Sequence, residues 1–160
     1  MNTEMVLAYT HTKEITELFS EYTEMLNAND RSIQKYLALQ HYEEEINHLE
    51  EKYGMPSGRL YLASCNKEAA GCIGLRKIDE QNCEMKRFYV RPKFRGQKLG
   101  GQLMQKIISD AKEIGYSYML LDTLPFLESA IRMYQKFGFY TIDRYNDSPV
   151  STSIYMRLDL

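Results

Sequence analysis

Apolar residues follow two different spacings along this chain. In several segments they recur every three or four positions, which predicts helices, because 3.6 residues per turn bring such positions onto one face. The expected helices begin near Thr12, span residues 33–53, run from residue 99 to Gly115, and occupy residues 127–137 before Gly138. The two glycines lie where a helix commonly ends in a left-handed backbone conformation.

Shorter apolar runs bounded by turn residues predict strands. The expected strands cover residues 5–9, 59–65, 70–77, 83–90, 118–123, 139–145 and 152–158. Short polar turns join the second, third and fourth strands, which predicts an antiparallel meander. The helix that follows must cross from the fourth strand to the fifth, so that pair is expected to be parallel. The sequence therefore predicts a mixed α/β fold, with a mostly antiparallel central sheet and about four flanking helices, in one domain over residues 1–160.

The composition is typical of a globular protein, with 44% hydrophobic and 26% charged residues. No apolar run approaches the ~20 residues of a membrane span, and Glu4 lies where a signal peptide would be basic, so we expect a cytoplasmic protein without a membrane partner. The three cysteines show no CxxC or zinc-ligand spacing, and the three histidines show no metal-ligand spacing. We therefore expect reduced cysteines and no metal.

Charge is distributed unevenly along the chain. Residues 1–53 contain four Lys or Arg against eleven Asp or Glu, whereas residues 84–98 contain six basic residues and one acidic residue. A nucleic-acid-binding domain would normally have a higher pI than about 6.0, so a compact polyphosphate fits the basic segment better. The acidic block Glu43–Glu45 is expected on an exposed helix face, and attraction of a cationic substrate is the alternative.

The basic segment ends in a glycine-containing turn that leads into a helix, Phe94–Met104, FRGQKLGGQLM. Backbone N–H groups and a helix N-terminus together favour a bound phosphate. A P-loop would require Lys and Ser or Thr after its last glycine, and Gln102 and Leu103 stand there instead. A dinucleotide-binding G-x-G-x-x-G motif is excluded by the spacing of the glycines and by their place in the order of elements.

Three segments in order resemble the GNAT superfamily of acetyl-CoA-dependent N-acetyltransferases. They are the turn Arg95–Gly100, similar to Q/R-x-x-G-x-G/A; the preceding strand EMKRFYVRP, residues 84–92; and AIRMYQKFGF, residues 130–139, similar to A-x-x-x-Y-x-x-x-G-F. The chain also resembles a bacterial group with an EMKR-x-YVRP strand and an LDT-x-P segment, here residues 121–125. The resemblance covers nearly the whole chain and implies the GNAT fold and acetyl-CoA as co-substrate.

The resemblance implies a coenzyme A site along the turn, the strand before it and the last helix. In this site, backbone N–H groups of about Gln97–Gly101 and the helix dipole would bind the diphosphate, with help from Arg95 and Lys98. The residues expected to bind the cofactor are Phe88, Tyr89, Val90, Arg95, Gly96, Gln97, Lys98, Leu99, Gly100, Gly101, Ala130 and Tyr134. Two positions depart from the family pattern: Lys98 replaces a glycine, and Leu127 replaces an asparagine that holds the pantetheine arm in many relatives.

Acetyl transfer to an amine requires a deprotonated nucleophile, a donor to the oxyanion and a proton for the thiolate. Tyr134 is the candidate acid, and a backbone N–H near Tyr89 or Val90 is the candidate oxyanion donor. The alternative for Tyr134 is a core tyrosine, because it lies on the apolar stripe of its helix. Glu84 is the candidate base, with an ion pair to Lys86, Arg87 or Arg76 as the equal alternative.

The acceptor site is expected around Arg76, Lys86 and Arg87, with Tyr22 and Tyr145 as lining residues. The three cations suit a carboxylate-bearing, amino-acid-like amine, whereas the acidic N-terminal helices would suit a polyamine. The expected function is acetyl transfer from acetyl-CoA to the primary amine of a small molecule, by direct attack in a ternary complex. A protein or peptide acetyltransferase and a non-catalytic CoA-binding sensory module are the alternatives, and association into a homodimer is left open.

Overall fold

The computed structural model describes residues 2–29, 42–148 and 150–160 of the chain. Its helices and strands alternate along the sequence much as the apolar pattern predicts. In order they are β1 (Thr3–Leu7), α1 (Thr12–Asn29), α3 (Tyr42–Asn47), α4 (Leu49–Tyr53), β2 (Arg59–Cys65), β3 (Glu68–Lys77), β4 (Asn82–Val90), a 3-10 turn (Pro92–Phe94), α5 (Leu99–Ile114), β5 (Tyr118–Thr123), α6 (Glu128–Phe137), β6 (Tyr140–Ile142) and β7 (Ile154–Asp159).

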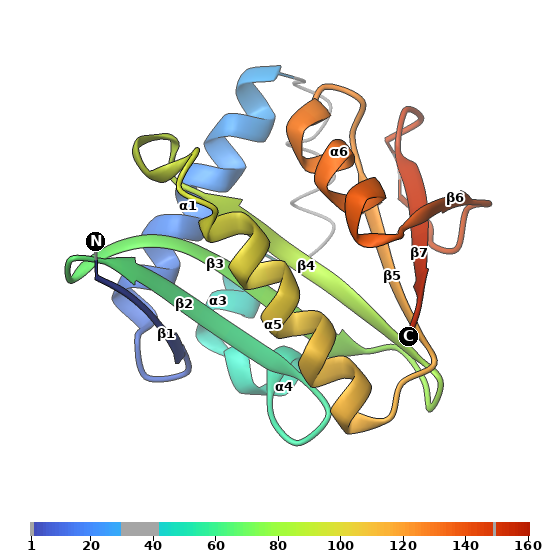
Figure 1. Cartoon of the computed structure of the whole chain (residues 1–160), viewed down its shortest axis with the longest axis horizontal. Coiled ribbons are helices and arrows are strands. Elements are labelled where there is room, and N and C mark those ends of the chain that lie inside the picture. The colour runs from blue at the N-terminus through green and yellow to red at the C-terminus, as the bar shows by residue number, and fades with distance from the viewer. Residues whose placement is uncertain (1, 30–41, 149) are drawn as a thin grey trace.

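The strands form one seven-stranded sheet in the order β1-β2-β3-β4-β5-β7-β6 (Figure 1). All neighbouring pairs are antiparallel except β4 and β5, which are parallel and are joined by the crossing helix α5. The predicted mixed α/β class, the antiparallel meander β2-β3-β4 and the single parallel pair are therefore confirmed.

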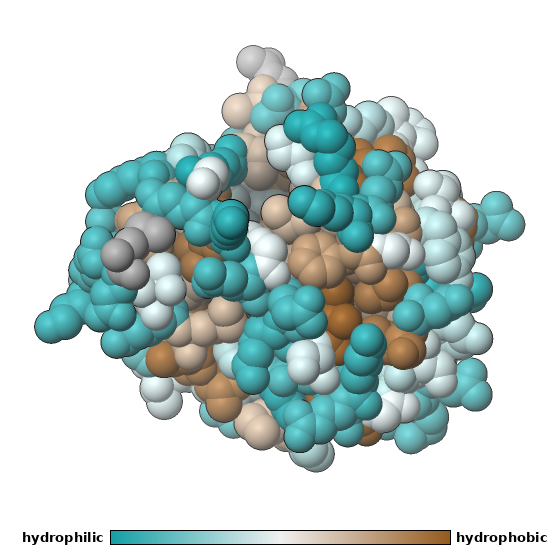
Figure 2. Space-filling view, in the orientation of Figure 1, coloured by the Kyte–Doolittle hydropathy of each residue, from teal (hydrophilic) through white to brown (hydrophobic). Residues whose placement is uncertain are grey.

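Helices cover both faces of the sheet (Figure 1). On one face the stripe of α5, including Leu103, Ile107 and Ala111, is completely buried against the sheet together with Tyr134 of α6. On the other face, Phe19 of α1 and Tyr53 of α4 fill a second core. Figure 2 shows polar residues over most of the α5 side, with apolar residues gathered between α5 and α6.

The expected helix over residues 33–53 is wrong in its described part, and residues 30–41 lie outside the described residues. The chain forms two short helices instead, separated at His48, whose backbone is not helical (φ −136°, ψ 50°). The break allows Tyr53 to pack closely over Gly74, where an added Cβ would come within 2.9 Å of the Tyr53 ring. Tertiary packing therefore outweighs the local helical pattern.

Strand β6 is also shorter than the expected segment of residues 139–145, since pairing with β7 covers only Tyr140–Ile142. Beyond it, the chain turns back across the sheet, where Tyr145 packs against the ring of Tyr155 with centroids 5.4 Å apart. This turn brings residues 145–148 to the end of β5, beside the candidate site.

The three cysteines are free and buried. Among residues 2–29, 42–148 and 150–160, no group of acidic, His and Cys side chains has the arrangement of a metal site. Within the same ranges, no helix combines the length and apolar character needed to cross a membrane.

A β-bulge and a separation of strands shape β4. Lys86 pairs with Gly74 and Tyr89 pairs with Cys72, so two residues of β4 lie opposite the single residue Ile73 of β3. Arg87, inside this bulge, has a left-handed backbone (φ 57°). A bulge turns side chains away from strict alternation and bends the strand. In the described residues β4 pairs with β5 only over Asn82–Glu84, and beyond that point the two strands separate.

Candidate active site

A cleft of about 50 Å³ lies where β4 and β5 separate, and α1 and α6 close its sides. The lining residues come from five parts of the chain that are remote in sequence. They are Tyr22, Leu26, Met85, Lys86, Arg87, Phe88, Asp122, Thr123, Leu124, Leu127, Tyr134, Val150 and Ser153. The walls combine apolar side chains with polar and charged ones, a mixture that can orient a small molecule.

Tyr134 reaches this cleft from α6. Its ring packs between Phe88 and Phe139, with centroids 6.2 Å and 5.8 Å away, and the residue is only 5% exposed. Among the described residues its hydroxyl makes no hydrogen bond. Burial raises the pKa of Tyr134 well above its usual value, so the hydroxyl keeps its proton at neutral pH. Tyr134 is thus both a packed core residue and a protonated group that faces the cleft.

The glycine turn places a helix N-terminus beside the cleft. Gly96 (φ 83°) and Lys98 (φ 65°, ψ 10°) are both left-handed, so Lys98 adopts a conformation that glycine takes at lower cost. Within the described residues no side chain caps α5, and no acidic residue lies in its first turn. The first N–H groups of a helix have no intrahelical acceptor. An added Cβ on Gly96 or Gly101 would meet nothing within 4 Å, so this end has room for a ligand.

Two contacts connect the turn to the cleft. The Arg95 Nε donates a hydrogen bond to the Val90 carbonyl at 3.0 Å, which fixes the turn to the end of β4. An added Cβ on Gly100 would lie 3.3 Å from the ring of Phe88 and 3.1 Å from Met133 of α6. The start of α5 therefore packs directly on the side chain that lines the cleft.

The edge of β4 that faces β5 is the third component of the site. Beyond Glu84 this edge forms no ladder with β5, so its backbone groups are directed toward the cleft rather than into the sheet. Phe88 lines the cleft, whereas the ring of Tyr89 packs on the opposite face, 6.0 Å from the ring of Tyr22. Unpaired strand backbone can bind an extended ligand as an added strand would.

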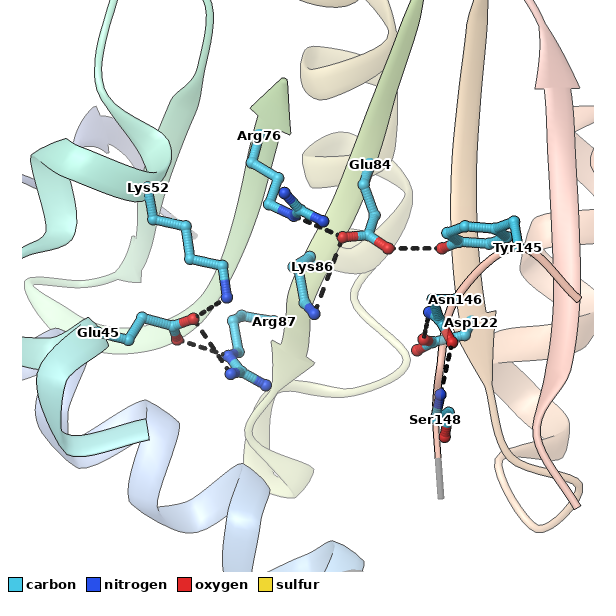
Figure 3. Close-up of polar contacts among 10 residues, drawn as sticks. All are labelled: Glu45, Lys52, Arg76, Glu84, Lys86, Arg87, Asp122, Tyr145, Asn146 and Ser148. Atoms are coloured by element: carbon cyan, nitrogen blue, oxygen red, sulfur yellow. Dashed lines mark hydrogen bonds and ion pairs between the residues drawn. The ribbon is translucent and has the colours of Figure 1, made fainter. Parts of the chain in front are cut away.

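Glu84 forms a buried ion-pair group on β4 (Figure 3). Its Oε1 accepts a hydrogen bond from Arg76 Nε at 2.7 Å and lies 3.8 Å from Lys86 Nζ. Its Oε2 accepts a hydrogen bond from the Tyr145 hydroxyl at 2.6 Å. Burial acts to raise the pKa of Glu84, but Lys86 and Arg76 outweigh it and lower the pKa. Both oxygens are engaged and the carboxylate is ionised, a geometry that suits the ion-pair alternative.

Arg87 forms a second buried pair, with a carboxylate that sequence reasoning missed. Arg87 Nε and Nη2 donate to the two oxygens of Glu45 at 2.7 Å and 3.2 Å, and Lys52 also donates to Glu45 (Figure 3). Glu45 is 6% exposed, so the expectation that the block Glu43–Glu45 lies on an exposed face is wrong for Glu45, while Glu44 is exposed. Burial raises the pKa of Glu45, yet Arg87 and Lys52 lower it to about 2. Nothing in the local pattern distinguishes Glu45 from its neighbours, because its partners are contributed by β4 and α4.

Sequence reasoning also missed a polar network at the end of β5 (Figure 3). Asn146 donates from Nδ2 to Asp122 Oδ2 at 2.7 Å, and its Oδ1 accepts from the backbone N–H of Ser148 at 3.1 Å. The Thr123 hydroxyl in the cleft wall is buried without a hydrogen-bond partner in the described part of the chain. The LDT-x-P segment, residues 121–125, contains Asp122 and Thr123 and is the part of the sequence that could have indicated this side of the cleft.

The structure therefore places most of the candidate residues near the cleft, some in its lining and the others around it. Tyr22, Lys86, Arg87, Phe88 and Tyr134 line the cleft itself. The remaining candidates lie around it: Arg76 and Tyr145 bind Glu84, Ala130 lies one turn before Tyr134 on α6, Tyr89 and Val90 end β4, and residues 95–101 form the adjacent turn. Leu127 lines the cleft with an apolar side chain where many relatives have an asparagine.

Comparison with known proteins defines the class. The model of the acetyltransferase (GNAT) family matches residues 13–139. The chain is 40% identical over 126 residues to an uncharacterised N-acetyltransferase of Schizosaccharomyces pombe, covering 78% of this chain and 77% of that protein. It is 32% identical to one from Dictyostelium discoideum over an alignment 222 positions long, gaps included, which covers all of both chains. The chain belongs to the GNAT family and is an N-acetyltransferase.

Solved structures agree with this assignment. The PaiA N-acetyltransferase of Thermoplasma acidophilum, solved in complex with coenzyme A, superposes with a TM-score of 0.78 over the whole of both chains at 18% identity. A GNAT family acetyltransferase of Elizabethkingia anophelis with acetyl-CoA bound has a TM-score of 0.56 and 27% identity, covering 82% of this chain and 83% of that one. The finer assignment to a bacterial group with the EMKR-x-YVRP strand stays a prediction.

Proposed function

We propose that this protein transfers the acetyl group of acetyl-CoA directly to the primary amine of a small molecule within a ternary complex. The observation that carries the proposal is the position of Tyr134. Its protonated hydroxyl faces the cleft between β4 and β5, and the uncapped start of α5 packs on the same cleft through Phe88. A bound acetyl thioester could thus reach from the turn to the tyrosine along the β4 edge.

The residues present fit coenzyme A. The N-terminal N–H groups of α5 would bind the diphosphate, and the exposed side chain of Lys98 would add positive charge there. Arg95 would act chiefly by holding the turn, since its Nε is engaged by Val90. The unpaired edge around Phe88, Tyr89 and Val90 would bind the pantetheine amides and supply an N–H to the carbonyl oxygen. Leu127 would make only apolar contact with that arm.

In the proposed reaction, the neutral amine attacks the thioester carbonyl carbon. A C–N bond forms and the C–S bond breaks. Tyr134 gives its proton to the coenzyme A thiolate, the nitrogen releases its proton to water, and the Tyr134 phenolate recovers a proton from water. Burial raises the pKa of Tyr134, so the hydroxyl holds its proton until the thiolate leaves. Burial raises the pKa of the Cys72 and Cys83 thiols to about 12, so both are poor nucleophiles, which favours direct transfer.

Glu84 is a positioning residue in this proposal. Its carboxylate holds Arg76, Lys86 and Tyr145 around the cleft, and the lowered pKa leaves it little tendency to accept a proton. A Glu84→Gln variant distinguishes this role from that of a base. If Glu84 is a base, the pH–rate profile of the variant should lose one titrating group. If Glu84 is a positioning residue, the variant should have a higher KM for the amine and the same pH–rate profile as the natural protein.

The test is release of free thiol from acetyl-CoA in the presence of amino acids, polyamines, aminoglycosides and peptides, for the natural protein and for Tyr134→Phe. We expect turnover of small amines, and a fall in kcat of about 100-fold in the variant with coenzyme A affinity unchanged. Tyr116→Phe is the matched control, because it removes a buried tyrosine hydroxyl, hydrogen-bonded to the Ser57 carbonyl, outside the cleft.

Three results would contradict the proposal. If Tyr134→Phe loses kcat and coenzyme A affinity to the same extent, Tyr134 has only a packing role. Coenzyme A binding without turnover of any amine would favour a binding module. Turnover of peptides alone would favour a protein or peptide acetyltransferase.

A further inference from the structure

A second hollow lies on the α4 side of the sheet, where α4 meets β3 and β4. It has a volume of about 480 Å³, and its lining is almost entirely cationic. The lining residues are Glu51 and Lys52 of α4, Arg76 and Lys77 of β3, and Lys86 of β4. We refer to these five residues as the cationic pocket.

The carboxylates near the cationic pocket are too few for its cations. Glu84 is shared by Arg76 and Lys86, and Glu45 is shared by Lys52 and Arg87. With the Lys77–Glu80 pair and Glu51 included, five cations face four carboxylates, and a net charge of +1 remains among these described side chains. The side chains of Glu45 and Glu84 are only 2% and 3% exposed. The cations extend toward the hollow, with side-chain exposures of 25% for Lys52, 35% for Arg76 and 12% for Lys86. The surface that a ligand meets is therefore positive.

The ionisation of the two lysines reflects this crowding. Burial and the neighbouring Lys86 lower the pKa of Lys52 to about 8, even though Glu45 acts in the opposite direction. Burial, followed by Arg87 and Arg76, lowers the pKa of Lys86 against the effect of Glu84. Glu51 does little to offset the repulsion among these cations, because its side chain is 79% exposed and lies 3.6 Å from His48. An anion bound in the pocket would remove part of this repulsion.

Lys86 connects the cationic pocket to the cleft, because it lines both hollows. Figure 3 shows Lys86 between the Glu45 group on one side and the Tyr145 and Asp122 side chains on the other. A ligand held by one end in the pocket would therefore direct its other end toward the cleft, where Tyr134 lies.

We propose that the cationic pocket binds the acidic group of the acetyl acceptor, so that the acceptor is an amine that also carries a carboxylate or a phosphate. This inference rests on the proposed acetyl transfer. A polyamine would bring a second ammonium into a net positive site, and the buried carboxylate of α3, Glu45, is already bound by Arg87 and Lys52. The acidic composition of the N-terminal helices therefore does not make this pocket attractive to a cation.

The kinetic test compares amines that differ only in the acidic group. The substrates are α- and ω-amino acids, O-phosphoethanolamine, and the amides or decarboxylated analogues of the same amines, with thiol release from acetyl-CoA as the readout. We expect kcat/KM to be about tenfold higher for the acids, mainly through KM, because the acidic group makes a charge-assisted contact that the neutral analogue lacks. The carboxylate and phosphate members show which oxyanion the pocket prefers.

Lys52→Gln should remove most of that difference by lowering the rate with acids and sparing the neutral amines. Lys77→Gln at the rim is the second variant, for use if Lys52→Gln does not fold. Lys112→Gln on α5, exposed on the other face of the sheet, is the matched control and should retain the full preference.

A binding measurement separates this inference from the proposed function. Calorimetric titration of the coenzyme A complex with N-acetyl amino acids and their methyl amides should show about tenfold weaker binding of the amides, a difference that Lys52→Gln abolishes. Equal kcat/KM for neutral amines and for acids would overturn the acidic acceptor and leave acetyl transfer standing. If no amine is turned over, the proposed function fails. In that case, tighter binding of the N-acetyl amino acids than of their methyl amides still supports an anion site in the cationic pocket. Equal binding of the two would overturn it.

Discussion

The glycine turn and the cationic pocket would each bind an anionic group, the turn through backbone N–H groups and the pocket through side chains. The turn uses consecutive residues, Gly96–Gly101, and offers backbone N–H groups and a helix dipole, which any residues in that conformation would provide. The pocket uses side chains from α4, β3 and β4, held by carboxylates of α3 and β4. A backbone site suits a co-substrate common to a family, whereas a side-chain site can change with each acceptor. The comparison indicates that donor binding should tolerate substitution and that the acceptor side should not.

Removal of Glu45 should have the largest effect. Glu45→Ala leaves the Arg87 guanidinium buried without its carboxylate, and we expect the free energy of unfolding to fall by about 3–5 kcal/mol. Chemical denaturation measures it. Glu24→Ala, at an exposed position of α1, should change stability by less than about 0.5 kcal/mol. Equal effects of the two substitutions would show that the pair does not hold the acceptor side together.

Stability should also depend on pH through Glu45. Its pKa is lowered from 4.5 to about 2 in the folded state, so its contribution is complete above the unfolded value near 4.5 and is lost as the pH falls toward 2. The shift corresponds to about 3 kcal/mol. Urea denaturation across this range should show the loss, and Glu45→Gln should lack that part of the pH dependence. A natural protein whose stability is flat between pH 5 and 2 would contradict the buried pair.

A smaller effect is expected in the turn. Arg95 and Lys98 changed together to Ala should weaken coenzyme A binding by about tenfold, because the helix N-terminus remains, and the loss should shrink as salt is added. Titration calorimetry at two salt concentrations measures both. Lys93→Ala is the control, since Lys93 is a nearby exposed lysine that pairs with Glu68. If the double variant binds coenzyme A with unchanged affinity, neither side chain contributes to the diphosphate site.

The smallest effect concerns the backbone of Lys98. Lys98→Gly relieves the left-handed conformation (φ 65°) but increases the entropy of the unfolded chain, so we expect a net gain of about 0.5 kcal/mol in the free energy of unfolding. Lys98→Ala removes the same charge and retains the Cβ, so it should give no gain. Thermal unfolding of both variants measures the difference. A loss of stability in Lys98→Gly would mean that the lysine side chain stabilises the turn.

The parts of the site that could be predicted are those formed by residues close together in the sequence. The turn, the β4 segment and the stripe of α6 each resemble a family pattern, and the structure brings Phe88 and Tyr134 to one cleft. The bulge at Arg87 could not be predicted, because it depends on the register of β4 against β3. The alternative of an ion pair between Glu84 and Arg76 or Lys86 was within reach, because these residues lie close along the chain. The Glu45 partner of Arg87 and the Tyr145 partner of Glu84 were not, since they lie 42 and 61 residues away.

The sequence by itself determined the class of fold and most of the order of its helices and strands, and it predicts a phosphate site at the turn. These follow from local periodicity, from glycine conformations and from the chirality of short connections. Only the tertiary structure decided that Glu45 is buried, that Glu84 is shared among three partners, and that four cations surround a hollow beside the cleft. The reason is physical: the pairing of charges depends on distances between side chains, and folding sets these distances independently of separation along the chain.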